Sequence, residues 1–252
     1  MDLGLKGKVA IVTGTGSQIG YGRGIVQALA KEGCNIMSVD MDLEGATKTA
    51  SEAKTLGVKS IALKTDIRKR VEVDKMIQTA ISEFGKIDIL INNAGASSIP
   101  GPFINKTEAE INADIDINLR GCINCCQAVL GHMISRKSGK IINVSSNGAK
   151  TGGAGVAVYC AAKAGVMVFT KSLAAEVIRQ GINVNSIAPG QGNTGFALQA
   201  PPDLLAKFRE MIPIGRSTTP EDIGNMAAFL ASDVSVDVVG QTYSVDGGLT
   251  MY

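Results

Sequence analysis

Short apolar runs alternate with longer amphipathic segments along most of the chain. Seven runs rich in β-branched residues are expected to form strands: Lys8–Thr13, Asn35–Val39, Ser60–Lys64, Ile87–Ile91, Lys140–Ser145, Asn183–Ile187 and Gln241–Val245. Between them, apolar residues at helical spacing predict helices, among them Arg23–Lys31, Glu44–Leu56, Val71–Phe84 and Gly155–Arg179. Runs such as VAIV do not alternate in polarity, which is typical of strands covered on both faces. The repetition of strand and helix therefore predicts an α/β fold, a doubly wound parallel sheet with helices on both sides.

The whole chain, residues 1–252, is expected to fold as a single domain. It contains no linker-like, repetitive or low-complexity stretch, and 252 residues are near the upper limit for one core. No apolar run approaches the ~18 residues that a membrane helix needs, and the N-terminal sequence lacks a signal-peptide pattern. The formal net charge of +2 indicates neither a nucleic-acid-binding nor a membrane-binding surface. Five cysteines, an odd number, favour reduced thiols and a cytoplasmic location.

Metal and hydrolase chemistry is limited by the single histidine, His132. This residue would have to be the general base of any Ser-His-Asp site, which argues against a hydrolase of that type. Cys122, Cys125 and Cys126 share one face of a helix, but a zinc site needs a fourth ligand, and no second cysteine pair stands at a suitable spacing. The three thiols are therefore predicted to be small buried side chains, and no metal site is expected.

A glycine-rich segment, TGTGSQIGYGRG, lies between the first predicted strand and the first predicted helix. Backbone N–H groups of such a turn can face a pyrophosphate, and a Cβ there would hold the phosphates away. Asp40 ends the second strand 18 positions after Gly22, close to the ~20 at which an acid binds the ribose hydroxyls of a dinucleotide. Met41 is not basic, and no Arg or Lys precedes Arg23 in the loop, so a 2′-phosphate would meet a carboxylate without a cation beside it. The pattern therefore favours NAD over NADP in a Rossmann-type nucleotide site.

Tyr159 and Lys163 stand four residues apart in a strongly helical segment, so their side chains share one face. A free tyrosine has a pKa near 10, and an adjacent ammonium would lower that pKa toward the range of a useful base. A cationic nicotinamide nearby would lower it further. The pair is thus a candidate acid/base unit. By itself the spacing is a weak signal, because chance gives any Tyr a Lys four positions later about one time in fifteen.

Further motifs follow the glycine-rich loop in a set order. They are NNAG at Asn92–Gly95, Asn118, Ser146, Tyr159-x3-Lys163, Pro189-Gly190 and DGG at Asp246–Gly248. This series resembles the short-chain dehydrogenase/reductase family. The resemblance runs from about Leu5 to the end of the chain. Several separate motifs in one register are a specific signal, whereas each of them alone could be an ordinary turn, cap or strand end.

The resemblance implies roles for four catalytic residues. Tyr159 would be the proton donor or acceptor, and Lys163 would lower the pKa of Tyr159 and hold the nicotinamide ribose. Ser146 lies 13 positions before Tyr159, so this serine, in preference to Ser145, would bind the substrate oxygen. Asn118 would anchor a water that relays protons from Lys163 to solvent.

The resemblance also implies a set of residues that bind NAD. In the glycine-rich loop and at the end of the second strand they are Gly14, Ser17, Gly20, Tyr21, Gly22 and Asp40. On the adenine side they are Asp66, Ile67, Asn92, Ala94 and Gly95, and on the nicotinamide side Tyr159, Lys163, Pro189, Gly190, Gly192 and Thr194. The loop departs from the family pattern, because five residues separate Gly14 from Gly20 instead of three, and Tyr21 stands where an aliphatic residue is usual. A longer loop of this kind also occurs in the related enoyl reductases, which space Tyr and Lys differently.

These residues predict an enzyme, an NAD-dependent oxidoreductase that transfers a hydride reversibly between NAD(H) and a secondary alcohol or ketone. The small-molecule substrate is expected to be apolar or a hydroxyacyl thioester. One alternative is a 3-oxoacyl thioester reductase that uses NADPH. An alternative of another class is a catalytically idle partner or sensor subunit that binds NAD.

Two expectations concern the periphery of the site. A segment at about residues 195–216 is expected to form a substrate lid. In it, Leu204, Phe208 and Met211 stand at helical spacing and are expected to face inward. The resemblance also implies a homotetramer built through the helices that hold Asn118 and Tyr159. Small residues on those helices would permit close approach of the subunits: Cys122, Cys125, Ala161, Ala162 and Ala164.

Overall fold

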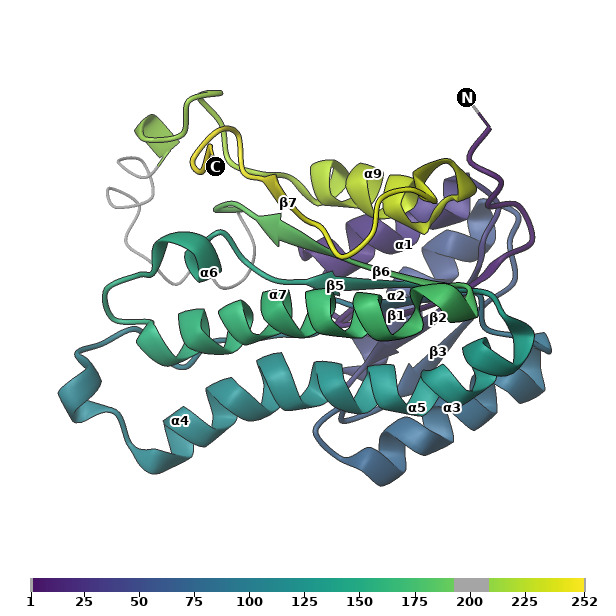
Figure 1. Ribbon diagram of the computed structural model, residues 1–252, viewed down its shortest axis with the longest axis horizontal. Helices are drawn as coiled ribbons and strands as arrows, with labels where there is room; N and C mark the ends of the chain where they lie inside the picture. The colour runs from purple at the N-terminus through teal and green to yellow at the C-terminus, as the bar shows by residue number, and fades with distance from the viewer. Residues whose placement is uncertain (1, 193–208, 252) are drawn as a thin grey trace.

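Seven parallel strands form one sheet in the order β3-β2-β1-β4-β5-β6-β7 (Figure 1). The structure, a computed structural model, describes residues 2–192 and 209–251. The strands are β1 (Val9–Thr13), β2 (Asn35–Asp40), β3 (Ser60–Lys64), β4 (Ile89–Asn92), β5 (Gly139–Val144), β6 (Ile182–Pro189) and β7 (Thr242–Val245). The chain first adds strands on one side of β1 and then crosses to the other side with β4. The predicted single α/β domain with a doubly wound parallel sheet is confirmed.

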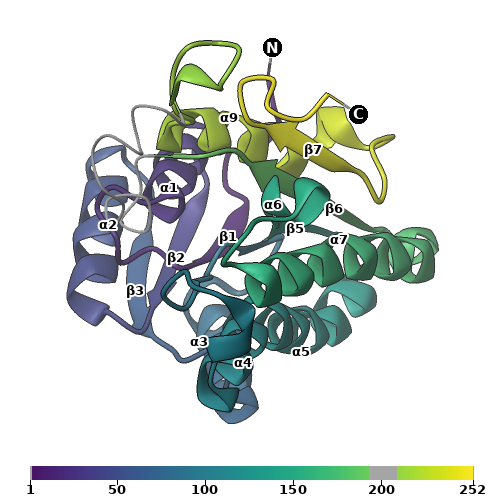
Figure 2. The ribbon, with the colours of Figure 1, turned by 90° about the vertical axis from the view of Figure 1, so that its left-hand side faces the viewer.

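Helices cover both faces of the sheet (Figures 1 and 2). One layer holds α1 (Tyr21–Lys31), α2 (Leu43–Thr55) and α9 (Pro220–Ala231), and the other holds α3 (Arg70–Phe84), α5 (Gly121–Arg136) and α7 (Ala157–Val177). Each layer has its own apolar core against the sheet, with Ile25 and Leu29 of α1 in the first and Met76 and Met133 in the second. Strands β1, β4 and β6 are buried along their whole length, because helices cover both faces of the sheet.

The predicted strands and helices differ from the observed ones by at most two residues at the ends of the strands and of the first three helices. Two helices that were not predicted, α4 (Glu108–Ile115) and α9, carry a visible start signal. Thr107 and Glu110 form a capping box at the first, and Thr219 and Asp222 form one at the second, where Pro220 occupies the first turn. In both boxes the hydroxyl accepts an N–H of the first turn while the carboxylate accepts the N–H of the capping residue. The sequence therefore held enough information to place these two helix starts.

The long apolar helix α7 corrects one expectation. Together with the short turn that follows it, the segment Ala157–Gln180 is long and apolar enough to cross a bilayer by length and composition. Counting uninterrupted apolar residues missed it, because Lys163 and Lys171 divide the run. In the fold it is a core helix, packed on the sheet through Val166 and Val177.

Three of the five small residues that were expected between subunits point inward. Cys122 and Cys125 of α5 and Ala162 of α7 are buried within the chain itself. Ala161 is exposed, so it remains available to a partner subunit. All five cysteines are free and buried. Burial raises the pKa of Cys125, and a hydrogen bond with Cys122 together with burial raises that of Cys126, so both stay neutral thiols. Among the described residues, no three His, Cys, Asp or Glu side chains converge as metal ligands.

Asp88 joins the start of β4 to its neighbours at the edge of the sheet where the strands begin. Its side chain is only 6% exposed. One oxygen accepts the N–H of Val9 at 2.9 Å and the ammonium of Lys86 at 2.9 Å, and the other accepts Arg136 at 2.7 Å. Burial acts to raise the pKa of this carboxyl, but the hydrogen bonds from Arg136 and Lys86 outweigh it, so the pKa lies below its usual range.

Asp88→Ala is expected to lower the free energy of unfolding by about 2 kcal/mol at pH 7, because it removes these hydrogen bonds. The loss is not larger, because both cations are partly exposed and their charges are screened by solvent. Since the folded-state pKa is depressed, this stabilisation is present above the unfolded pKa of ~3.9 and is lost as pH falls. Urea titrations at pH 7 and pH 3 check both statements. Asp233→Ala, which removes only a 3.7 Å surface contact with Lys8, serves as the control and should change stability by less than about 0.5 kcal/mol. A full loss that persists at pH 3 would contradict the charge argument.

Candidate active site

The predicted site residues gather where the parallel strands end. In this sheet β1 and β4 are neighbours, and the chain leaves them toward opposite sides, which opens a crevice at their carboxyl ends. The loops after β1, β4, β5 and β6 all reach this edge, as does the beginning of α7. Figure 2 shows the molecule from this side, with α6 (Gly148–Thr151) and the start of α7 toward the viewer.

The glycine-rich loop packs directly on the loop after β4. Gly14 has a positive φ of 74°, and a Cβ on it would lie 2.6 Å from the Cα of Ala94. A Cβ on Gly22 would overlap the carbonyl oxygen of Gly14. The side-chain amide of Asn93 donates to the carbonyls of Thr13 and Gly14 and so ties the two loops together. Asn93, absent from the predicted set, therefore shapes the phosphate loop.

Asp40 contacts the lengthened part of the glycine-rich loop at Gly16. Its carboxylate accepts the N–H of Gly16 at 2.8 Å and the N–H of Asp42 at 2.9 Å. A Cβ on Gly16 would lie 2.9 Å from the Asp40 carboxyl carbon, so glycine allows this approach. The Gln18 amide donates to the carbonyls of Gly16 and Gly45, which fastens the longer loop to the start of α2. Each Asp40 oxygen keeps lone pairs for a ribose hydroxyl, since one N–H occupies each.

The exposed Ser17 and the half-buried Gly20 lie in the same turn. Gly20 donates its N–H to the Ser17 carbonyl at 3.1 Å, and a Cβ on Gly20 would lie 3.0 Å from the Ser17 side chain. This turn presents the first N–H groups of α1, which begins at Tyr21, toward the crevice.

Asp66 is tied to Arg68, which was not among the predicted site residues. Arg68 donates to both Asp66 oxygens at 2.8 Å, through Nε and Nη2, and its Nη2 lies 3.8 Å from the sulfur of Met41. The hydrogen bonds from Arg68 hold the pKa of the Asp66 carboxyl below its usual range, against the effect of burial. A cation therefore does lie beside Met41, but its charge is balanced by Asp66. Ile67 is buried next to this pair and packs against Gly121.

The residues of the NNAG segment, Asn92–Gly95, do not all face the same way: some face the sheet and others the crevice. Asn92 is turned into the sheet, where its amide donates to Asn143 Oδ1 at 2.9 Å and contacts the Cys126 sulfur at 3.2 Å. Ala94 packs against Gly14, as described above. Gly95 lies at the crevice, and a Cβ on it would be 2.7 Å from Asn118 Oδ1 and 2.9 Å from Lys163 Nζ. The segment thus steadies the sheet centre with Asn92, and at the exposed Gly95 the lack of a side chain lets Asn118 and Lys163 approach the backbone.

The two adjacent serines after β5 have different surroundings. Ser145 is buried, and its hydroxyl donates to the carbonyl of Lys163 at 2.8 Å. The Ser146 oxygen accepts the N–H of Gly148 at 3.2 Å and forms a hydrogen bond with Tyr159. Ser146 is half-buried, and its hydroxyl lies at the crevice beside Tyr159. This geometry favours Ser146 over Ser145 as the group that meets a substrate oxygen.

Tyr159 and Lys163 lie one turn apart near the start of α7, but no lowering of the tyrosine pKa results. Burial raises the pKa of Tyr159, and the hydrogen bond from Ser146 offsets only part of this effect. Lys163 Nζ donates to the carbonyl of Val144 at 2.8 Å and lies 6.0 Å from the centre of the Tyr159 ring. Burial lowers the pKa of Lys163 to about 8. The ammonium is therefore placed between the end of β5 and the crevice.

Asn118 sits in a π-helical turn, Asp116–Arg120, between α4 and α5. Its amide nitrogen donates to the carbonyls of Ala96 at 2.6 Å and Asp114 at 2.8 Å. Its Oδ1 is buried and has no partner among the described residues. Such turns are frequent at functional sites because they re-aim one side chain out of the helix register. The orphaned Oδ1 lies on the same side of Gly95 as Lys163 Nζ.

The wall across the crevice is formed by the end of β6. Pro189 accepts the N–H of Asn147 at 2.9 Å, and Gly190 donates to Val245 at 3.0 Å. Gly192 forms a bridge with Thr218. Thr194 and most of the expected lid lie outside the described residues. Met211, which was expected to face inward, is 67% exposed, so this part of the prediction is wrong.

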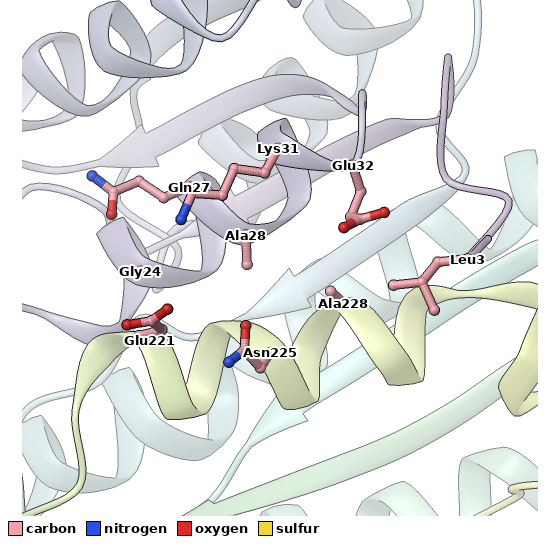
Figure 3. Close-up of a pocket in the computed structure, with 9 residues that line it drawn as sticks. All are labelled: Leu3, Gly24, Gln27, Ala28, Lys31, Glu32, Glu221, Asn225 and Ala228. Carbon is pink, nitrogen blue, oxygen red and sulfur yellow. The ribbon is translucent and has the colours of Figure 1, made fainter. Parts of the chain in front are cut away.

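The arrangement fits a nicotinamide dinucleotide. The crevice offers helix N–H groups and an acid at the end of β2. At the exposed Gly95, which has no side chain, an orphaned oxygen of Asn118 and the ammonium of Lys163 approach the backbone closely. The groove in Figure 3, about 270 Å³, lies elsewhere, between α1 and α9, where residues such as Gln27, Lys31 and Asn225 line it. None of the predicted catalytic side chains contributes to that groove.

Comparisons with known proteins agree with this geometry. Residues 14–250 match the family model described as enoyl-(acyl carrier protein) reductase. A dehydrogenase subunit for (2S)-[(R)-hydroxy(phenyl)methyl]succinyl-CoA, BbsD of Thauera aromatica, is 37% identical over 250 residues, 99% of each chain. The 3-ketoacyl-(acyl-carrier-protein) reductase from Brucella melitensis, crystallised with NADH, is 34% identical with a TM-score of 0.91, over 98% of this chain and 100% of that one.

A variant of the actinorhodin polyketide ketoreductase, crystallised with NADPH, is 31% identical with a TM-score of 0.92, and the match covers 97% of this chain and 98% of that one. Both nicotinamide cofactors thus occur among the similar structures. Sequence, fold and the geometry of the crevice agree, and the chain belongs to the short-chain dehydrogenase/reductase family of oxidoreductases, which act on small-molecule substrates.

Proposed function

We propose that this enzyme transfers a hydride reversibly between NAD(H) and a secondary alcohol or ketone. The observation that carries the proposal is the convergence of four side chains on the crevice beside Gly95. They are Asn118, Ser146, Tyr159 and Lys163. A catalytically idle relative would have no reason to keep this set in register. An NAD-dependent oxidation assay over a panel of secondary alcohols tests the proposal, and complete inactivity would favour the idle subunit.

The proton chemistry follows from the positions of these groups. A bound nicotinamide supplies hydride transfer at its C4. The Tyr159 hydroxyl gives or takes the proton at the substrate oxygen, while the Ser146 O–H donates to that oxygen and holds it. Lys163 Nζ and Asn118 Oδ1 flank Gly95 and can pass the proton through water to solvent. Because burial raises the pKa of Tyr159, the free enzyme holds a protonated hydroxyl at neutral pH, as reduction of a ketone requires.

The preference for NAD is proposed from Asp40. Its carboxylate is anchored at the end of β2 by two backbone N–H groups and would repel a 2′-phosphate. The nearby Arg68 does not offset this repulsion, because its guanidinium is paired with Asp66 through two hydrogen bonds. The alternative, a 3-oxoacyl thioester reductase that uses NADPH, is supported by its relatives among ketoacyl reductases, and cofactor binding distinguishes the two.

NADH is expected to bind at least about ten times more tightly than NADPH, and Asp40→Asn should reduce this preference about ten-fold. The substitution removes the charge but keeps one oxygen for the loop, and a charge-assisted hydrogen bond contributes roughly 1.5–3 kcal/mol. Titration calorimetry with both cofactors measures the ratio. Asp42→Asn is the matched control, since Asp42 caps α2 two residues away and should leave the ratio unchanged. Equal affinity of the wild-type protein for both cofactors would contradict the role of Asp40.

We propose an apolar alcohol or a hydroxyacyl thioester as the substrate class, a cytoplasmic location, and a homotetramer. The relative BbsD, named for a coenzyme A thioester, supports the thioester alternative. For the tetramer, exposed apolar residues on the outer faces of the two long helices, Ile123 of α5 and Val168 of α7, supply a surface for a second copy. Light scattering that shows a monomer at micromolar concentration would refute the assembly.

A further inference from the structure

Tyr21 links two parts of the crevice that are far apart in the sequence. It is the first residue of α1, next to the N–H groups of the phosphate loop. Its side chain crosses to the loop after β6, where the hydroxyl donates to the carbonyl of Gly190 at 3.2 Å. Burial is the main cause that raises the pKa of Tyr21, so the hydroxyl stays neutral and remains a donor at physiological pH.

Gly192 is shaped to receive this tyrosine. A Cβ on Gly192 would overlap the Tyr21 hydroxyl oxygen and would lie 2.7 Å from the ring carbon that bears it. The same Cβ would lie 3.0 Å from the carbonyl of Thr218, so it could not move aside. The tyrosine therefore occupies the volume that a side chain at position 192 would otherwise fill. The two residues form a complementary pair.

The backbone of Gly190–Gly192 is otherwise held from the far side. Gly190 donates to Val245 at 3.0 Å, and Gln191 accepts the N–H of Thr218 at 3.0 Å. Tyr21 adds a bond from the opposite side, and it comes from the phosphate loop itself. The aromatic ring of Tyr21 is rigid and has few torsional degrees of freedom, so it couples the position of one loop to that of the other.

We propose that Tyr21 is a positioning residue that ties the phosphate loop to the Gly190–Gly192 wall, so that the two halves of the dinucleotide site are set together. The inference rests on the proposed function, since it assigns this wall to the nicotinamide half. Holding both loops before the ligand arrives reduces the ordering that binding would otherwise require. The tie acts on the nicotinamide half and leaves adenosine recognition at Asp40 unaffected.

Tyr21→Phe tests the hydrogen bond, because it keeps the ring and removes only the hydroxyl. NADH binding measured by titration calorimetry should weaken about three- to ten-fold, as expected for one lost hydrogen bond to a buried carbonyl. ADP-ribose, which lacks the nicotinamide, should bind within about two-fold of its wild-type affinity. Tyr243→Phe, at a half-buried tyrosine of β7, is the matched control and should change neither. Equal weakening of both ligands by Tyr21→Phe would overturn the proposal, because a general defect of the phosphate loop would do that.

A double substitution tests the complementary pair. Gly192→Ala should weaken NADH binding at least about ten-fold in the wild-type background but less than about two-fold when Tyr21→Val has removed the ring. Thermal unfolding of each variant identifies loss of the fold separately from loss of binding. Additive effects of the two substitutions on NADH affinity would also overturn the proposal. If the wild-type protein binds neither NADH nor ADP-ribose, the proposed function itself fails.

Discussion

Tyr159→Phe is expected to lower turnover by about 10³-fold or more in both directions while NADH affinity changes less than about two-fold. The substitution removes the one hydroxyl positioned to exchange a proton with the substrate, and positioned acid/base groups contribute ~10²–10⁴-fold. The aromatic ring remains, so the packing at the start of α7 is preserved. Steady-state rates with the best alcohol of a panel, together with NADH titration, provide the two measurements.

The pH dependence gives this prediction a second test. Burial raises the pKa of Tyr159, so the hydroxyl is protonated at neutral pH in the free enzyme. Ketone reduction uses that proton, whereas alcohol oxidation first requires its loss. The oxidation rate of the wild-type enzyme should therefore rise with pH, and the residual rate of the variant should not follow the same curve. Turnover retained in Tyr159→Phe, with the wild-type pH profile, would rule out the assigned role.

The fold was predictable because its signals are local. A strand such as β1 is apolar on both faces, and Gly14 and Gly22 must lack a Cβ where the loops after β1 and β4 touch. The motif order predicted Tyr159, Ser146 and Asn118 as parts of one site, and the structure brings them to the same edge of the sheet. Each of these features depends on residues that are close in the sequence or that come directly after a strand, so a local pattern is enough to predict it.

The missed contacts depend on pairs that are distant in sequence. Arg68 reaches Met41, 27 residues earlier, and only the packing of β2 beside β3 brings them together. The partner of Tyr21 is 169 residues away. Cys122 and Cys125 were correctly predicted to be buried side chains, but the sequence did not show that they pack in the core of their own chain and not against a second subunit. No spacing rule identifies such partners, because they are set by the tertiary arrangement.

The acid/base pair shows a different limit of sequence reasoning. Four-residue spacing placed Tyr159 and Lys163 on one helix face, and this led to the expectation of a lowered tyrosine pKa. In the fold, desolvation acts on both groups, raising the pKa of Tyr159 and lowering that of Lys163. Spacing gives proximity but not the depth of burial, and here burial is the larger effect. For alcohol oxidation, we propose that the positive charge of a bound oxidised nicotinamide lowers the pKa of Tyr159.

Lys163→Met is expected to lower turnover by about 10²-fold or more and, at pH 7, to stabilise the fold. Burial lowers the pKa of Lys163 to about 8, against ~10.4 in the unfolded chain, so keeping the ammonium charged below pH 8 costs about 3 kcal/mol. Between pH 8 and 10.4 the unfolded chain holds more protons than the folded one, so wild-type stability rises with pH in that window. Methionine has a similar shape and no charge, but it leaves the Val144 carbonyl without its donor, a loss of roughly 1–3 kcal/mol.

Lys163→Met removes the cost of the buried charge and also loses the hydrogen bond to Val144. The first effect should therefore dominate at neutral pH and the second at high pH. At pH 7 the variant should be about 1 kcal/mol more stable than the wild type, and by pH 10 it should be less stable, because the cost of the charge has then vanished while the lost hydrogen bond remains. Urea titrations at both pH values measure the difference, with the exposed Lys171→Met on the same helix as the matched control. An equal loss of stability at pH 7 and pH 10 would contradict the burial argument. A gain at pH 7 together with lost turnover would show that this lysine is kept for catalysis at the expense of the fold.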